Sequence, residues 1–306
     1  MLVVKDDPIQ TSIRDVLSDI RKVYHVESSL FYRTFVRKDH PNCHIIYTYP
    51  FTTMPSTETQ ISIIIPIYNE EPSIRELHQA ITQVTSGTYG RYEILFVNDG
   101  STDNTEDTLK KLRNEDPEHV SCINFDQNYG KALALRAGFT EARGDIFITM
   151  DGDLQDDPTE IPRFVEKIEG GYDLVSGWKV RRLDSFVKNN TSKIYNAVTS
   201  LASGVYLHDH NCGFKAYRRE VALGLPLHGQ LHRYIPLLAS ANGYEMICEI
   251  EVNHRKRQHG TTKYGPSRFI YGITGLVHAL SIAHKVKENT IDGMTLPTYH
   301  LKDKTV

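Results

Sequence analysis

The chain has 306 residues, of which 40% are hydrophobic and 24% are charged, and its formal net charge is −3. This length suits one large α/β domain or two smaller ones, and the slightly acidic balance argues against a general nucleic-acid-binding protein. The cysteines are scattered and form no CxxC motif, so we expect reduced thiols in a cytoplasmic protein. They are Cys43, Cys122, Cys212 and Cys248.

The sequence predicts neither a secretion signal nor a membrane-spanning helix. The N-terminal segment MLVVKDDPIQ lacks a basic stretch followed by an apolar one. No run of 18 apolar residues occurs, and the nearest, residues 269–283, is interrupted by His278. We therefore expect a protein that is soluble or attached peripherally at the cytoplasmic face of a membrane.

Residues 1–60 differ from the rest of the chain and form an N-terminal extension. Apolar residues recur there at helical spacing, which predicts one amphipathic helix; they are Ile13, Val16, Leu17, Ile20 and Val23. We expect an irregular stretch after this helix, followed by a polar linker at residues 52–60.

From residue 61 onward, apolar runs typical of buried parallel strands alternate with helical segments. This order predicts an α/β fold with a single, mainly parallel (mixed) twisted sheet flanked by helices. Ligands in such sheets bind beyond the carboxyl ends of the strands. The predicted strands are 61–68, 92–97, 120–125 and 146–150, and the predicted helices are about 72–84, 104–114, 130–142 and 158–169.

The strongest functional signal follows the fourth predicted strand, in MDGDLQDDP at residues 150–158. Four aspartates within seven residues repel one another unless a cation or hydrogen bonds offset the charge. Mg²⁺ and Mn²⁺ take oxygen ligands and often share them with a diphosphate, although a solvated acidic loop remains the alternative. The residues concerned are Asp151, Asp153, Asp156 and Asp157, beside Gln155.

Two other strand ends carry candidate residues. Asp99 leaves the second strand towards the ligand side of the sheet, where its carboxylate could accept a hydrogen bond from a base or a ribose. Lys131 begins a helix, a position that the helix dipole disfavours for a cation, so an anionic group nearby is indicated. A solvated lysine explains Lys131 about equally well.

Other site types fit the sequence poorly. The acidic loop lacks the glycine and glutamate positions of an EF-hand, and the 14 histidines show no HExxH spacing. A nucleotidyltransferase would need a glycine-rich, arginine-containing loop after the first strand, where this chain has PIYNEEPS.

These motifs, in this order, resemble glycosyltransferase family 2, in the branch of dolichol-phosphate mannose synthases and bacterial polyprenyl-phosphate glycosyltransferases. The resemblance covers roughly residues 60–270 and implies a GT-A domain over 61–265. The motifs that carry it are SIIIPIYNE, VNDGSTDNT, NYGKALALRAGF, MDGDLQDDP, SGWKVRR, HDHNCGFKAYRREV, LHRYIPLLA and VNHRKRQHGTTKYGPSRF.

The resemblance implies a nucleotide-sugar donor, Mg²⁺ or Mn²⁺ as cofactor, and roles for individual residues. Asp151 and Asp153 form the DxD element, in which Asp153 and Gln155 are the main metal contacts and Asp151 lies nearer the ribose. The donor site also includes Pro66, Tyr68, Glu70, Asp99, Lys131 and Gly152, while Lys179 and Lys193 match positions that bind an acceptor phosphate. Asp153, Asp209 and Arg257 are the expected catalytic residues, Arg257 near the donor diphosphate.

The resemblance also implies an inverting transfer, and the acceptor decides whether a base is needed. A polyprenyl phosphate is already anionic, whereas a saccharide or protein hydroxyl requires a general base, for which Asp209 is the candidate. Asp209 could equally be a turn residue. We expect a hexose to move from a UDP- or GDP-sugar to a polyprenyl phosphate; the alternatives are a hydroxyl acceptor or a non-catalytic nucleotide-sugar-binding protein.

Residues 266–306 are expected to form an amphipathic helix and a polar C-terminal tail. An interfacial helix on a membrane and a helix packed against its own domain would both show the apolar residues found at 267–283.

Overall fold

The computed structural model describes residues 2–5, 31–40, 43–51, 60–180, 196–255, 268–287 and 297–305. The chain divides into two compact units, Met1–Thr57 and Glu58–Val306. Within the described residues, no helix is both long and apolar enough to cross a membrane.

The first unit contains a small antiparallel sheet with the strand order β1-β3-β2. Its strands are β1 (Leu2–Lys5), β2 (Phe31–His40) and β3 (Cys43–Phe51). Strands β2 and β3, in a stretch that the sequence predicts to be irregular, therefore form an antiparallel pair rich in the aromatic and β-branched residues that favour strands. The predicted helix around residues 13–23 lies outside the described residues.

The second unit is built on one eight-stranded sheet with the order β10-β8-β9-β7-β4-β5-β6-β11. All of its strands run parallel except β9 and β11, so the sheet is mixed but mainly parallel, as predicted. The strands are β4 (Gln60–Ile67), β5 (Arg91–Asn98), β6 (Val120–Phe125), β7 (Ile146–Thr149), β8 (Leu174–Trp178), β9 (Lys215–Arg218), β10 (Ile247–Glu251) and β11 (Leu301–Thr305).

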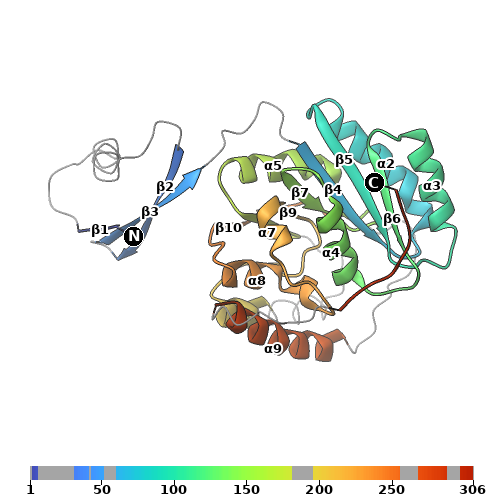
Figure 1. The fold of residues 1–306 in the computed structure, drawn as a ribbon. Coiled ribbons are helices and arrows are strands. Elements are labelled where there is room, and N and C mark those ends of the chain that lie inside the picture. The colour runs from blue at the N-terminus through green and yellow to red at the C-terminus, as the bar shows by residue number, and fades with distance from the viewer. Residues whose placement is uncertain are drawn as a thin grey trace. The chain divides into compact units, whose positions relative to one another are not determined.

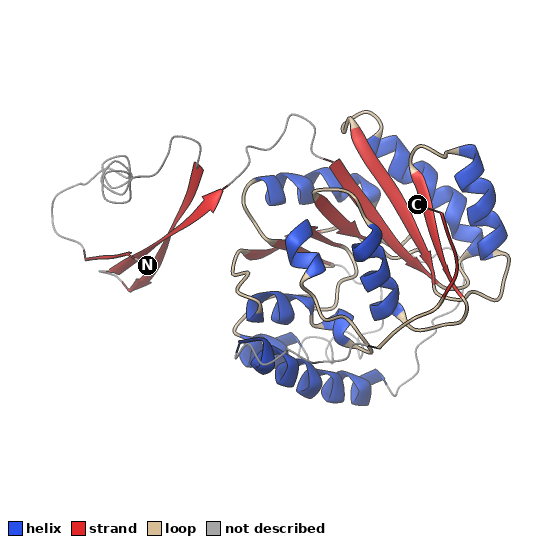
Figure 2. Ribbon diagram, viewed as in Figure 1, coloured by secondary structure: helices blue, strands red, loops and turns tan. Residues whose placement is uncertain are grey.

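Helices cover both faces of this sheet (Figures 1 and 2). One face packs against α2 (Glu71–Thr85), α3 (Thr105–Glu115) and α5 (Ile161–Glu169), which follows the short helix η1 (Pro158–Glu160). The other packs against α4 (Lys131–Glu141), α7 (Arg219–Leu223), α8 (Ile235–Ala241) and α9 (Arg268–Lys287), with η2 (Leu231–Arg233) preceding α8.

Strand β4 shows how the sequence builds the two cores. Ile61, Ile63 and Ile65 face the α2–α3–α5 side, while Ile64 faces the α4 side, as the two-residue period of a strand requires. Helix α4 approaches β4 closely because Gly138 has no side chain: a Cβ there would lie 2.4 Å from Cγ2 of Ile64. Because β4, β5, β6 and β7 run parallel, their carboxyl ends lie at one edge of the sheet, above a tightly packed core.

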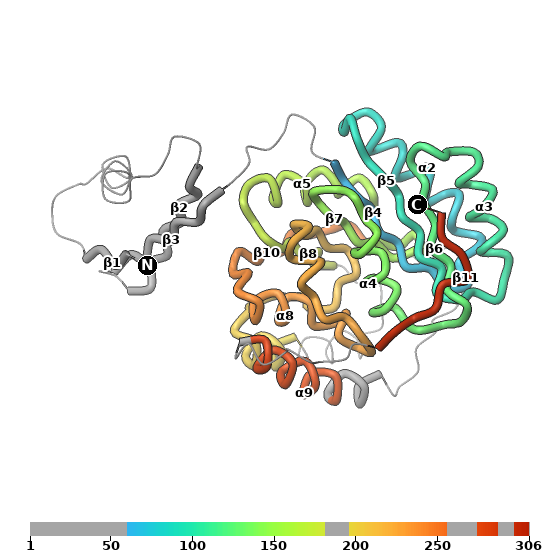
Figure 3. Tube along the Cα trace, in the orientation of Figure 1, coloured from blue at the N-terminus to red at the C-terminus, as the bar shows by residue number. Residues whose placement is uncertain are grey.

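The C-terminal residues are part of this sheet rather than a separate polar tail. Strand β11 pairs antiparallel with β6 and runs along it in Figure 3. Asn124 donates a hydrogen bond to Asp303 at 2.6 Å, and Lys302 pairs with Glu106 at 2.7 Å. The polar sequence LKDKT suits an edge strand, where side chains remain in water.

Helix α9 packs against its own domain. Leu276, Ala279 and Ile282 are buried against the core that includes α8, whereas Val277 is 65% exposed. Among the described residues of α9, the buried face therefore agrees with the packed alternative.

Candidate active site

The acidic loop follows β7 and begins with Asp151, whose carboxylate forms an ion pair with Lys131 at the start of α4. Burial opposes ionisation, but Lys131 and Lys179 hold the pKa of Asp151 well below its usual range. The anionic group expected beside Lys131 is therefore this carboxylate. About a third of the Asp151 side chain, 34%, remains exposed, so the pair is accessible from solvent.

Gly213 packs directly against Asp151. A Cβ at this glycine would lie 2.7 Å from both carboxylate oxygens, closer than any side chain could approach. The segment from Asp209 to Gly213, which precedes β9, is thereby brought to the acidic loop from more than 50 positions along the chain.

The last two aspartates of the loop hold its own shape. Asp156 is 1% exposed; it accepts a hydrogen bond from the backbone N–H of Asp151 at 3.0 Å and pairs with Lys179 at 2.8 Å. Asp157 caps η1 by accepting from the backbone and hydroxyl of Thr159, and it pairs with Arg255 at 2.7 Å. These contacts explain two of the four aspartates without a bound metal.

The position of Lys179 follows from this arrangement. Its side chain is 11% exposed, and its ammonium contacts Asp156. Burial alone would lower the pKa of Lys179, but Asp156 raises it above the usual range for lysine, so the side chain is charged. Its predicted contact with an acceptor phosphate remains a prediction.

Asp153 and Gln155 supply the remaining oxygen atoms of the loop. Asp153 is 7% exposed and accepts from the backbone N–H of Gln155 at 3.2 Å. Leu154, between them, has a φ of 64°, a conformation that is rare for a leucine and therefore marks a tight turn. The backbone of Gln155 is tied to Arg255, whose N–H donates to its carbonyl at 2.9 Å.

These residues fit a hard divalent cation whose coordination is completed by water and substrate. Asp151, Asp153 and Gln155 offer carboxylate and amide oxygens, which Mg²⁺ and Mn²⁺ prefer. Over the ranges that the structure describes, no three His, Cys, Asp or Glu side chains are grouped so as to hold a metal by themselves.

Asp99 holds the loop that leads into α4. It is 4% exposed, and its carboxylate accepts from the backbone N–H groups of Tyr129 at 2.7 Å and Gly130 at 2.9 Å. Burial raises the pKa of Asp99 to about 6, while the two N–H donors lower it. Asp99 thus fixes the segment that delivers Lys131, in addition to its predicted role towards a nucleoside.

The turn after β4 completes this edge of the sheet. Asn69 has a φ of 53° and exchanges hydrogen bonds with Ser101 and Thr102 of the neighbouring turn. Gly152 lies close to Glu70, since a Cβ at Gly152 would be 3.8 Å from Cγ of Glu70. Pro66 lies in β4 and pairs in register with Val97 of β5, and Tyr68 directly follows the end of β4.

One residue near Asp151, His232, was missed by the sequence analysis. Burial, aided by Lys131 and Arg233, lowers the pKa of His232 to about 3, so this imidazole is neutral beside the ion pair. Lys215 is 1% exposed and donates to the carbonyl of His210 at 3.2 Å. His232 stands in a motif that carried the family resemblance, but no spacing rule singled it out. Lys215, in contrast, belongs to the basic residues of the second half of the chain that favour a phosphate acceptor.

Asp209 lies at the start of the segment that ends at Gly213 and contacts Asp151, and it is 2% exposed. Its carbonyl accepts a hydrogen bond from Ser176 at 3.4 Å, which ties it to β8. Lys193 and Arg257, predicted to bind phosphates, lie outside the described residues.

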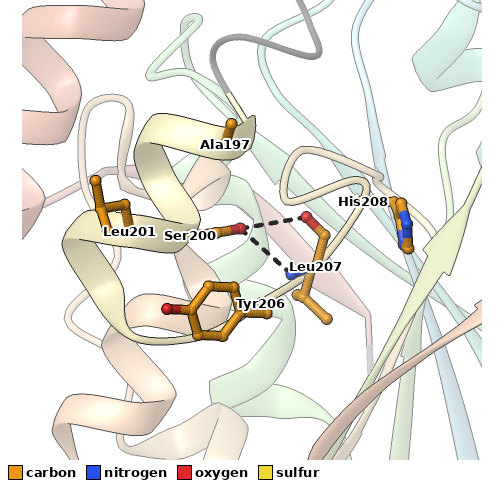
Figure 4. Close-up of a pocket in the computed structure, with 6 residues that line it drawn as sticks. All are labelled: Ala197, Ser200, Leu201, Tyr206, Leu207 and His208. Atoms are coloured by element: carbon orange, nitrogen blue, oxygen red, sulfur yellow. Dashed lines mark hydrogen bonds between the residues drawn. The ribbon is translucent and has the colours of Figure 1, made fainter.

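A mostly apolar pocket of about 420 Å³ is lined by residues that include His208, which precedes Asp209 in sequence. Figure 4 shows the hydroxyl of Ser200 turned towards the backbone of Leu207, with Leu201 and Tyr206 at the side. Leu201 is 78% exposed and Tyr206 is 76% exposed. The pocket is lined by Ala197, Ser200, Leu201, Tyr206, Leu207 and His208.

Sequence comparison places this site among known proteins. Residues 62–224 match the family described as glycosyl transferase family 2. The chain is 37% identical over 224 residues to undecaprenyl-phosphate 4-deoxy-4-formamido-L-arabinose transferase of Proteus mirabilis, covering 73% of this chain and 68% of that protein. The enzyme of the same name from Pseudomonas aeruginosa is 37% identical over 72% of this chain and 65% of its own length. The chain thus spans about two thirds of these relatives.

Structural comparison identifies the fold. Glucosyl-3-phosphoglycerate synthase from Mycobacterium tuberculosis, a GT-A protein, superposes with a TM-score of 0.56 at 20% identity, covering 73% of this chain and 80% of that one. The same enzyme with Mn²⁺, UDP and phosphoglyceric acid gives a TM-score of 0.55 at 18% identity, covering 72% of this chain and 78% of that one. The expected GT-A fold is confirmed.

Proposed function

Because the chain belongs to glycosyl transferase family 2, we propose that this glycosyltransferase moves a hexose from a UDP- or GDP-sugar to a polyprenyl phosphate, with inversion and with Mg²⁺ or Mn²⁺. The observation that carries the proposal is the Asp151–Lys131 pair at the carboxyl edge of the sheet, with Asp153 and Gln155 in the same loop. The pair combines an oxygen ligand for a cation with a cation for a phosphate.

The donor half of the reaction follows from these charges. Negative charge develops on the nucleoside diphosphate as the bond to the sugar breaks. Asp151, Asp153 and Gln155 would hold a divalent ion there, and this ion would supply Lewis-acid stabilisation. Lys131 adds a second positive charge at the same place, in a partly buried site where electrostatic interactions are strengthened.

The acceptor half is supported by the relatives and by the pocket. The relatives named above act on undecaprenyl phosphate, by their names. In this chain the mostly apolar pocket is lined by residues that include His208, the residue before Asp209, and by the exposed side chains of Leu201 and Tyr206. A lipid phosphate needs apolar contacts of this kind for its chain, and its anionic head attacks without a base. Use of a polyprenyl phosphate as acceptor implies that the enzyme contacts a membrane surface peripherally.

A hydroxyl acceptor is the second candidate. Asp209 favours it, because this buried carboxylate lies in the turn that contacts Asp151 and could accept a proton from an attacking hydroxyl. The two candidates differ in whether the reaction depends on Asp209. If the acceptor is a phosphate, the rate of transfer by Asp209→Asn should stay within a few-fold of the native rate. If the acceptor is a hydroxyl, the rate should fall by about 10²–10⁴-fold.

One assay tests the proposal. The native protein with Mg²⁺ or Mn²⁺ is incubated with a panel of labelled UDP- and GDP-sugars and with short polyprenyl phosphates, saccharides or a protein as acceptors, and the products are extracted into organic solvent. We expect label in the lipid fraction for one donor. Label that reaches only a water-soluble saccharide or protein would contradict the lipid acceptor, and absence of transfer with every acceptor would contradict the enzyme itself.

A further inference from the structure

Lys215, at the start of β9, is a lysine held inside the sheet. It pairs in register with Thr149 of β7 and Ser176 of β8, and it is 1% exposed. Its ammonium donates to the carbonyls of His210 and Cys212. A buried ammonium is costly unless such acceptors compensate for the water it has lost, so these contacts account for the placement of a charged residue there.

Both carbonyls belong to the turn 209–213, which touches each half of the proposed site. Asp209 opens the turn on the pocket side. Gly213 closes it with its Cα against the Asp151 carboxylate, and its carbonyl accepts from the hydroxyl of Thr149 at 2.8 Å. A shift of this turn would therefore move Asp209 and the packing of Asp151 together.

The charges around Lys215 also belong to the site. Burial lowers the pKa of Lys215, the carboxylates of Asp209 and Asp151 raise it, and Lys131 lowers it further. Lys215 is thus within electrostatic reach of both carboxylates, while its own donors are directed at the backbone of the turn.

We propose that Lys215 is a positioning residue for sugar transfer, which fixes the 209–213 turn so that Gly213 keeps the Asp151 carboxylate in place. The inference rests on the function proposed above. Misplacing reacting groups by even a fraction of an ångström lowers the rate of the chemical step more than the affinity for substrate. Lys215 therefore acts on kcat, through the turn.

The test replaces Lys215 with Met, which has a similar length but no N–H donors. We expect kcat to fall by about 10- to 100-fold while KM for the nucleotide sugar stays within about twofold. Lys215→Arg, which keeps a charged donor, should have a kcat at least fivefold higher than that of Lys215→Met. A purely structural role would lower the melting temperature and the folded fraction, but not kcat per folded molecule.

Arg219 provides a matched control at the other end of β9. Its guanidinium also donates to two backbone carbonyls, those of Ala142 at 2.9 Å and Gly144 at 3.2 Å, but it lies away from the acidic loop. Arg219→Met should reduce the melting temperature and leave kcat within about twofold. Equal losses of kcat in Arg219→Met and Lys215→Met would overturn the proposal, as would a native kcat in Lys215→Met.

If Lys215→Met fails to fold, Lys215→Gln replaces it, since one amide can satisfy one of the two carbonyls. kcat should then decrease in the order native protein, Lys215→Arg, Lys215→Gln, while KM for the nucleotide sugar stays constant. A native kcat in Lys215→Gln would reject the positioning role. Activity of the native protein distinguishes a failure of the role proposed for Lys215 from a failure of the proposed function. Transfer by the native chain with unchanged variants rejects the role of Lys215 alone, whereas no transfer by the native chain rejects the proposed function and this inference with it.

Discussion

At the scale of single residues, the acidic loop divides its carboxylates between two tasks. Asp156 and Asp157 are occupied by Lys179, Arg255 and the backbone, and they set the path of the loop. Asp151 keeps a third of its side chain exposed beside Lys131. Asp151 is thus the aspartate that could contact a substrate, because its partner Lys131 also lies at the candidate site.

Lys179 offers the first test of this division. Lys179→Met leaves the buried Asp156 carboxylate without its ion-pair partner, which costs about 3–5 kcal/mol of unfolding free energy. The additional change Asp156→Asn should restore much of that loss, because no buried charge remains. Denaturant unfolding of the single and double variants measures both values. A Lys179→Met protein as stable as the native one would show that the pair contributes nothing.

Asp99 should make stability depend on pH. Its pKa is about 6 in the folded protein, above the value of 3.8 for an unperturbed aspartate, so the folded state binds the proton more tightly. The stability that this contributes is present below about pH 4 and is lost as the pH rises through 6. Asp99→Asn, which cannot ionise, lacks this loss.

Relative to the native protein, Asp99→Asn should therefore gain on the order of 2–3 kcal/mol between pH 4 and pH 7, on top of any constant offset. Urea unfolding at several pH values measures the difference. A difference that stays flat over this range would mean that Asp99 titrates in the folded protein as it does in the unfolded chain.

At the scale of elements, α4 delivers Lys131 to the site, and Gly138 sets how closely this helix packs on β4. Gly138→Ala places a Cβ 2.4 Å from Cγ2 of Ile64, so the helix must move. The expected cost is about 1–3 kcal/mol, reduced by the better helix propensity of alanine. Thermal unfolding tests this.

A second variant checks the cause. Ile64→Ala removes the clashing methyl group, so Gly138→Ala should cost less in that background than in the native protein, which is a favourable coupling between the two changes. Strictly additive effects would show that the contact with Ile64 does not limit the packing of α4.

At the scale of the whole molecule, the sequence predicted the elements whose pattern is local. The four buried strands and their helices follow from apolar periodicity, and the boundaries at β4, α4 and β7 agree within two residues. Strand β11 could not be predicted, because LKDKT at an edge carries no apolar pattern. Its pairing with β6 depends on a partner about 180 positions away.

The site was predictable to a similar extent. The ends of parallel strands must meet, so the convergence of Asp99, Lys131 and Asp151 follows from the topology. Their partners do not: Lys179 and Arg255 reach the acidic loop from two further strands, and the burial of Lys215 depends on how β9 inserts between β7 and β8. These contacts are set by tertiary packing, which no local pattern records.

We propose above that the acidic loop binds a divalent ion for the transfer of a nucleotide-activated sugar. Asp153→Ala tests it most directly, with Asp103→Ala as a control, since Asp103 is an aspartate that accepts a backbone N–H outside this loop, that of Thr105 at 3.0 Å. Transfer from the labelled nucleotide sugar is measured with Mn²⁺ or Mg²⁺ and with excess chelator, alongside circular dichroism. We predict that Asp153→Ala and chelator each abolish transfer while the fold persists and Asp103→Ala remains active. Full activity in Asp153→Ala, or in excess chelator, would contradict the account.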